Sequence, residues 1–213
     1  MTGESIHLLL HGLLVTLELC LGGAALAIVL AFLAGLGRLS LDPIVRGAAR
    51  IYVELFRGTS ILVQLFWFYF AFPLVLGIEI PAMAAGILVL GLNVGAYGAE
   101  VVRGAIQDVP QGQHEAAIAL DLTRWQRMRH VIVPQALPAM LPPAGNLLIE
   151  LVKASAVVSM ITIGDLTYAA DRIREHTLET GVVYGTVLIL YFAIAQAIAL
   201  VIRRLERRWR HHV

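Results

Sequence analysis

One apolar stretch past the middle of the chain carries three polar residues at helical spacing. Asn146, Glu150 and Lys153 are four and three residues apart, which places them on one face of a helix. They could line a site for a small zwitterion, with Glu150 facing a cationic group and Lys153 facing a carboxylate. Glu150 and Lys153 could instead neutralise each other, or bind a partner helix through hydrogen bonds. The residue types leave these alternatives open.

Two other acid–base pairs stand three residues apart, Glu54 with Arg57 and Glu100 with Arg103. We expect structural or gating ion pairs from both, and Glu100 is also a candidate for the substrate pathway. The sequence shows no nucleophile–base set and no cluster with metal-ligand spacing, and its single cysteine lies in an apolar run. We therefore predict neither an enzyme nor a metal site.

The elements that position these residues must lie in a membrane. Of 213 residues, 59% are hydrophobic and 15% charged, whereas soluble domains are about 45–50% apolar and about a quarter charged. A spanning helix needs about 20 mostly apolar residues. Five stretches qualify, at about residues 12–37, 60–76, 81–102, 141–163 and 182–202. The fold class is therefore all-α integral membrane, and the net charge of +1 indicates no nucleic acid partner.

The distribution of arginines predicts the orientation. Thirteen arginines follow the first, third and fifth stretches, whereas only Arg172 and Arg174 lie on the opposite side and Lys153 lies inside the fourth. Because cytoplasmic segments carry the excess of basic residues, the topology is N-out and C-in. Five helices without an internal repeat are few for a complete pathway, so a transporter built from this chain needs a second subunit.

The cytoplasmic segment 108–134 is too long for a simple connection. Asp108 can cap a first short helix with Pro110 in its first turn, and Thr123 followed by Gln126 is a capping-box pattern for a second. We expect Pro134 to end that second helix. The segment reads as a solvated amphipathic hairpin or as a docking element for a partner.

Part of this segment resembles the EAA loop of bacterial ABC-importer permeases. Glu115, Ala116 and Ala117 are followed, at the family spacing, by Val131–Pro134, with valine at both aliphatic positions. Asp121 stands where the family has glycine. Aspartate also enters the left-handed conformation readily, so we expect the turn to persist.

A second resemblance, to the polar-amino-acid permeases of the histidine, glutamine and arginine type, extends over about residues 12–165. The matching text lies at 52–59, 62–66, 96–104, 110–113, 134–137 and 142–146. The resemblance implies a type I ABC importer transmembrane domain over residues 1–213, in the bacterial cell membrane. Residues around Glu150 also resemble permeases for the compatible solutes ectoine and hydroxyectoine.

The resemblance implies partners and a division of labour. Two ATPase subunits bind inside, a second permease subunit of the same or a homologous chain completes the pathway, and a substrate-binding protein docks outside, where the polar segment 165–180 is the candidate surface. The chain has no GxxxxGK[ST] loop, so it binds no cofactor, and ATP and magnesium belong to the ATPase. Glu115 would anchor the ATPase, with Ala116, Ala117 and Asp121 shaping the coupling helix.

Two functions outside this class remain as alternatives. A small membrane assembly factor or enzyme with a cytoplasmic hairpin predicts a catalytic cluster at a membrane face. A self-sufficient channel or carrier predicts transport without an ATPase. Association with an ATP-binding subunit separates both from the importer.

Overall fold

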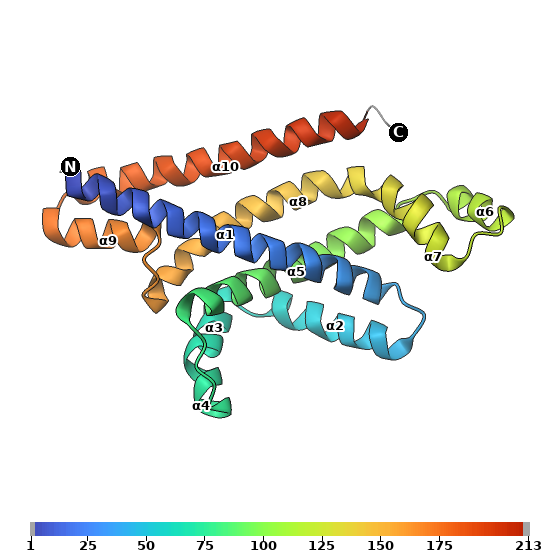
Figure 1. Ribbon diagram of the computed structural model, residues 1–213, viewed down its shortest axis with the longest axis horizontal. Coiled ribbons are helices and arrows are strands. Elements are labelled where there is room, and N and C mark those ends of the chain that lie inside the picture. The colour runs from blue at the N-terminus through green and yellow to red at the C-terminus, as the bar shows by residue number, and fades with distance from the viewer. Residues whose placement is uncertain (1–2, 211–213) are drawn as a thin grey trace.

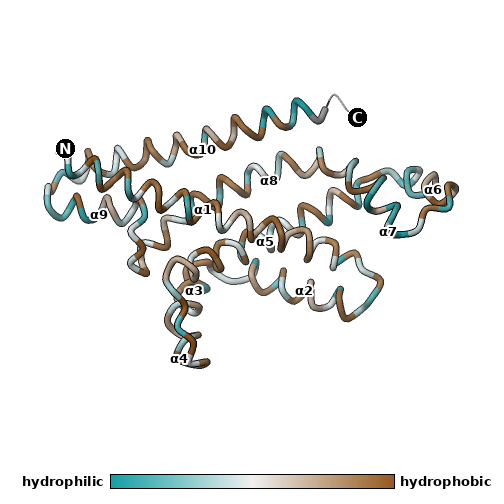
Figure 2. The backbone as a smooth tube through the Cα atoms, viewed as in Figure 1, coloured by the Kyte–Doolittle hydropathy of each residue, from teal (hydrophilic) through white to brown (hydrophobic). Residues whose placement is uncertain are grey.

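The computed structural model describes residues 3–210, with side chains through residue 208, and the regular elements in that range are helices. Four long units form the body: α1 (Gly3–Arg38), α5 (Ala82–Gln107), α8 (Val133–Ser155) with its 3-10 continuation η3 (Ala156–Ile161), and α10 (Thr180–Arg210). They run along the long axis of the molecule (Figure 1) and are mostly apolar (Figure 2). Each is long and apolar enough to cross a membrane, and a bent helix pair supplies a fifth candidate. The predicted all-α membrane fold is confirmed.

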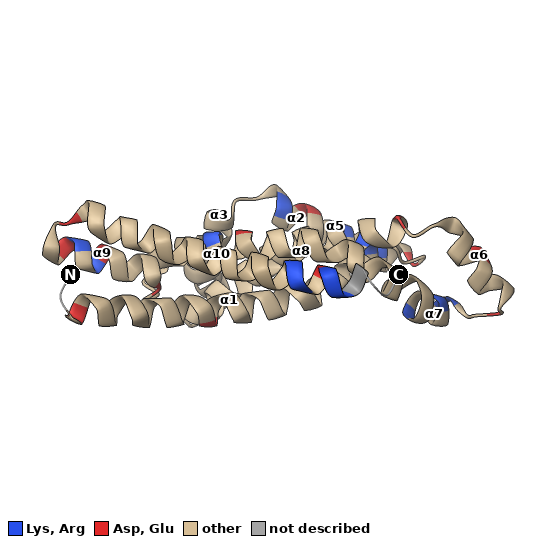
Figure 3. Cartoon of the chain, turned by 90° about the horizontal axis from the view of Figure 1, so that it is seen from above, with Lys and Arg blue, Asp and Glu red and all other residues tan. Residues whose placement is uncertain are grey.

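The two ends of the bundle differ in charge. The start of α1 lies beside α9 (Leu166–Thr177) at one end, and α6 (Gln111–Ala119) and α7 (Arg124–Arg127) lie at the other (Figure 1). Basic side chains gather toward the half of the molecule that holds α7 and the end of α10 (Figure 3). This arrangement gathers the arginine-rich ends at one end of the bundle; the N-out, C-in orientation stays a prediction.

The bent pair departs from a simple span. It consists of α2 (Pro43–Gly58) and the run α3 (Ile61–Phe66), the π-helical η1 (Trp67–Ala71) and α4 (Phe72–Leu76), with an angle of 106° between the halves. Figure 1 shows α3 and α4 leaving the bundle sideways. The helix α2 lies outside the five predicted stretches, although Asp42 and Pro43 mark its start: the Asp42 side chain accepts a hydrogen bond from the Ile44 amide.

The segment between α5 and α8 contains two short helices, α6 and α7, joined by a turn. Asp121 in that turn has a φ of 54°, the left-handed conformation expected for this position. The capping box between Thr123 and Gln126 is present in both directions. The local turn chemistry therefore formed as the sequence indicated.

Two predicted helix boundaries in this segment are wrong. Asp108 does not begin α6; it closes the C-terminus of α5, and Pro110 takes the position before α6. Pro134 does not end the second helix, because α7 continues through the π-helical turn η2 (Met128–Ile132) into α8. Pro134 lies in the first turn of α8, where the wider turn before it accommodates the missing amide donor.

The outer connection, expected to be a polar segment, contains the helix α9. Its buried residues Leu166, Ala169, Ala170 and Ile173 recur at helical spacing and pack near α1 and α10. Asp165 caps it by accepting a hydrogen bond from the Tyr168 amide. Burial raises the pKa of the Asp165 carboxyl to about 6, against the backbone hydrogen bonds that favour its charged form.

Small residues bring α1 and α5 into close contact. A Cβ added at Gly98 would lie 2.8 Å from Ala31 Cβ, and one at Gly35 would lie 2.8 Å from Val102 Cβ and 2.9 Å from the Ala99 carbonyl oxygen. In a lipid environment such small-residue contacts let helices associate through packing, without a hydrophobic driving force. The α1–α5 pair is thus the rigid centre against which the other helices pack.

We predict that Gly35→Ala lowers the free energy of unfolding by about 1–3 kcal/mol, because the added methyl group meets a stiff valine and a backbone oxygen. Thermal unfolding of the purified protein measures the change. Gly104→Ala on α5 is the control, since a Cβ there meets nothing within 4 Å and alanine favours the helix. Equal melting temperatures for the two variants would contradict this packing.

Candidate functional site

A cavity of about 410 Å³ lies where the α2–α3 bend approaches α5 and α8. Its size falls in the range of small-molecule sites, about 300–1,000 Å³. The bend contributes two hydroxyls and an apolar side chain, α5 an amide and a phenol, and α8 a carboxylate. The lining residues are Thr59, Ser60, Ile61, Asn93, Val94, Tyr97, Leu147, Glu150 and Ala154.

Two side-chain amides hold the bend that shapes this cavity. The Gln64 amide nitrogen donates to the Phe56 carbonyl at 3.0 Å and to the Thr59 hydroxyl at 2.7 Å. The Asn93 amide nitrogen, from α5, donates to the same Phe56 carbonyl at 3.0 Å and to the Gln64 side-chain oxygen at 3.2 Å. These bonds satisfy a carbonyl that the end of α2 leaves without an intrahelical partner.

The three polar residues predicted to share a face of α8 are all exposed, as that prediction requires. Their surroundings nevertheless differ. Glu150 lines the cavity at the bend, whereas Asn146 lines a separate cavity of about 160 Å³ against α10. Lys153 lines neither. Among the described residues, the ion pairs within 4.0 Å do not include one between Glu150 and Lys153. Within residues 3–208, Glu150 lines the cavity without a cationic partner within 4.0 Å.

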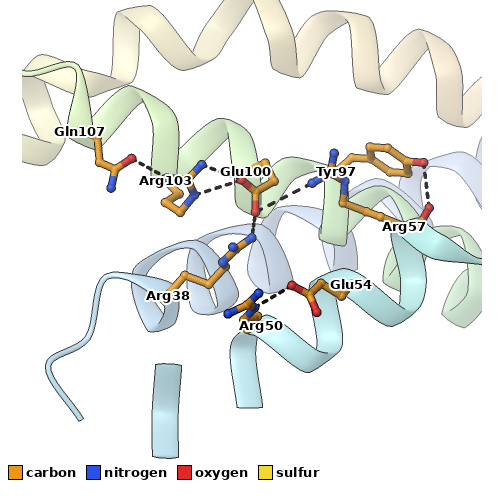
Figure 4. A network of polar contacts seen from close by, with 8 residues as sticks. All are labelled: Arg38, Arg50, Glu54, Arg57, Tyr97, Glu100, Arg103 and Gln107. Atoms are coloured by element: carbon orange, nitrogen blue, oxygen red, sulfur yellow. Dashed lines mark hydrogen bonds and ion pairs between the residues drawn. The ribbon is translucent and has the colours of Figure 1, made fainter. Parts of the chain in front are cut away.

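Glu100 does not line this cavity and instead joins three helices. Its carboxylate pairs with Arg38 at the end of α1, with Arg103 on α5 at 2.9 Å and with Arg57 on α2 at 3.9 Å (Figure 4). The Arg57 guanidinium also lies over the Tyr97 ring, 5.1 Å from its centre. One carboxylate thus ties the end of α2 at the bend to the end of α1 and to α5.

The structure supports one of the two predicted i, i+3 pairs and corrects the other. Glu100 and Arg103 are paired as expected. Glu54 pairs with Arg50 at 2.7 Å rather than with Arg57, because Arg57 turns toward the Glu100 carboxylate and the Tyr97 ring on α5. Tertiary contacts across helices decide this pairing, and spacing along α2 could not reveal them.

At the inner end, α6 exposes part of the predicted coupling surface. Glu115 and Ala116 are exposed, whereas Ala117 is only 2% exposed and packs inward. The Gln113 side chain accepts a hydrogen bond from the Gln135 amide nitrogen, which links α6 to the start of α8. This bond connects α6 to the helix that carries Glu150.

Sequence reasoning missed most of the cavity wall. Thr59, Ser60, Asn93 and Tyr97 come from two separate segments, and only the bend brings them to Glu150. Asn93 offered a signal, since an amide inside an apolar stretch needs hydrogen-bond partners. The partners themselves could not be read from the sequence.

The chain matches the family model for "Binding-protein-dependent transport system inner membrane component" over residues 27–211. It is 44% identical over 210 residues to the probable amino-acid ABC transporter permease protein y4tF of Sinorhizobium fredii, covering 95% of this chain and 88% of that one. It is 35% identical to the glutamine transport system permease protein GlnP of Escherichia coli, covering 96% and 94%. A crystal structure of an amino acid ABC transporter with histidines superposes with a TM-score of 0.88 at 36% identity, covering 96% and 95%.

We predict that Gln64→Leu destabilises the protein by about 1–3 kcal/mol, because the Phe56 carbonyl and the Thr59 hydroxyl lose a buried donor. Thermal unfolding of the purified protein measures the loss. Gln111→Leu, on the exposed start of α6, is the matched control and should change the melting temperature little. A Gln64→Leu protein as stable as the control would show that these bonds do not hold the bend.

Proposed function

The chain belongs to the binding-protein-dependent transport system inner membrane components, as a permease subunit of an amino-acid ABC importer, and we propose that the cavity at the α2–α3 bend is its substrate site. It is a multi-pass inner membrane protein, and ATP is hydrolysed by a separate partner subunit. The observation that carries the proposal is the Glu150 carboxylate, which faces this cavity without a cationic partner among the described residues.

The proposed substrate is a polar amino acid or a related small zwitterion. Glu150 supplies one negative charge for the substrate's cationic group, and Ser60, Asn93 and Tyr97 supply neutral polar groups around it. A charged carboxylate inside a membrane protein is costly, so its retention in a cavity favours a binding role. Because Lys153 does not line this cavity, the proposal does not assign it the substrate's carboxylate.

We infer that the chain forms half of the pathway. The relatives and the fold support a second permease subunit, of the same or a homologous chain, and a substrate-binding protein outside. The exposed Lys153, which lines neither cavity, is then available to the other half. The polar helix α9 is the proposed outer docking surface, with Asp171, Arg172 and Glu175 on it.

The proposed contact with the ATPase is α6. Glu115 and Ala116 are exposed there, and the apolar Ile118, Leu120 and Trp125 beside them are 57%, 74% and 66% exposed. Apolar side chains clustered on an exposed protrusion are typical of a protein interface. Ala117 is buried within this chain, so the proposal assigns it to holding α6 in place rather than to the ATPase.

We predict that Glu150→Gln raises the KM for transported amino acid by about ten- to a hundredfold, since a charge-assisted hydrogen bond contributes about 1.5–3 kcal/mol. Uptake into proteoliposomes that contain the whole importer measures it. Glu79→Gln, exposed in the connection before α5 and outside both the cavity and α9, removes the same charge as a control. An unchanged KM for every amino acid tested would remove Glu150 from the site.

We predict that Glu115→Arg abolishes most ATPase association, because the substitution reverses the one charge that α6 exposes beside its small residues. Co-purification of the permease with its ATPase measures the complex. Glu175→Arg makes the same charge reversal at the opposite end and should leave the yield of complex unchanged. Full association by the Glu115→Arg protein would show that this residue is not the anchor.

A further inference from the structure

A second polar cavity, of about 330 Å³, lies at the inner end of the bundle. It is formed by the end of α1, the first turns of α2 and the last turns of α5, and it shares no residue with the cavity that holds Glu150. Four of its seven lining residues are arginines. The residues are Arg38, Pro43, Arg46, Gly47, Arg50, Arg103 and Gln107.

The arginines of this cavity are only partly neutralised. Arg38 and Arg103 share the single carboxylate of Glu100, as Figure 4 shows, and Arg50 pairs with Glu54 at the exposed surface of α2. Arg46 has no carboxylate within 4.0 Å among the described residues, and its guanidinium donates a long hydrogen bond of 3.3 Å to the Ser40 carbonyl. The cavity therefore presents an excess of positive charge and suits an anion.

Guanidinium groups bind phosphate oxygens through paired hydrogen bonds, so a cavity with four of them suits a phosphate group. Apolar side chains flank this polar cavity. Leu41 and Ile44 are 70% and 79% exposed. They stand immediately before Asp42 and immediately after Pro43. Further along α2, Ile51 and Leu55 are 68% and 56% exposed and lie on the same helical face as Ile44.

This combination distinguishes a lipid from a free phosphate. A free phosphate ion has no use for the apolar face of α2, whereas a phospholipid offers a phosphate to the arginines and acyl chains to that face. The cavity lies at the arginine-rich ends of α1 and α5, where these helices leave the bilayer on the cytoplasmic side. Basic pockets between helices at this level are suited to acidic headgroups.

We propose that Arg38, Arg46, Arg50 and Arg103 bind the headgroup phosphate of an anionic phospholipid of the cytoplasmic leaflet, with its acyl chains along the apolar face of α2. Such a lipid would also place negative charge beside Arg38 and Arg103, which compete for Glu100. The site is thus next to the ion-pair cluster that ties α1, α2 and α5 together.

The test uses the permease purified with its ATPase in detergent and measures the melting temperature against added phosphatidylglycerol. We expect phosphatidylglycerol to stabilise the complex, and phosphatidylcholine and inorganic phosphate at equal concentration not to do so. Arg46→Gln should weaken the apparent affinity about five- to tenfold, since one basic residue contributes about 1 kcal/mol to anionic lipid binding. Arg204→Gln, an exposed arginine of α10 outside the cavity, should keep the wild-type affinity.

Native mass spectrometry of the same complexes counts retained phosphatidylglycerol. It therefore measures lipid binding even when a substitution shifts the melting curve for another reason. Loss of bound lipid from the Arg46→Gln complex, with retention in the Arg204→Gln complex, supports the site. Equal lipid retention by both overturns it. Stabilisation by inorganic phosphate alone also overturns it, in favour of a free anion as the occupant. Loss of the ATPase rather than the lipid from the Arg46→Gln complex overturns it in favour of the ATPase.

Discussion

The Phe56 carbonyl, at the end of α2, is the constraint on which the proposed substrate site depends. A helix that bends by 106° near the membrane leaves backbone groups without partners, and hydrocarbon offers no water to satisfy them. Gln64 and Asn93 both donate to this carbonyl and also bond to each other. Because one amide comes from α3 and the other from α5, the bend cannot open without separating those helices. The walls of the cavity that come from α2, α3 and α5 therefore keep a fixed relation to one another.

Contacts between the other helices support this arrangement. Close contact through Gly35 and Gly98 makes α1 and α5 a single rigid unit. Glu100 then ties that unit to α2 through arginines on all three helices (Figure 4). The Gln113–Gln135 hydrogen bond links α6 to α8. The proposed ATPase contact on α6 is therefore connected through α8 to the cavity at the bend.

The sequence determined the features that depend on local chemistry. Hydropathy gave the membrane fold, the capping box at Thr123 formed, and Asp121 adopted the left-handed turn. Prediction from the sequence failed where contacts between distant segments decide the local structure. Pro134 lies within a continuing helix because a π-helical turn precedes it. Arg57 does not pair with Glu54, because it contacts the Glu100 carboxylate and the Tyr97 ring on α5 instead. The cavity wall depends on the bend between α2 and α3, which the hydrophobic periodicity of the sequence does not predict.

The most direct measurement of the central claim is ATP hydrolysis by this chain assembled in nanodiscs with a candidate ATPase and a candidate binding protein from the same organism. Arginine, glutamine, glutamate, histidine and ectoine would be added one at a time. We expect one of them to stimulate hydrolysis, and only when the binding protein is present, because the proposed coupling connects the outer docking surface to the ATPase through α8 and α6. Failure of the chain to associate with an ATPase, or transport without one, would contradict the account.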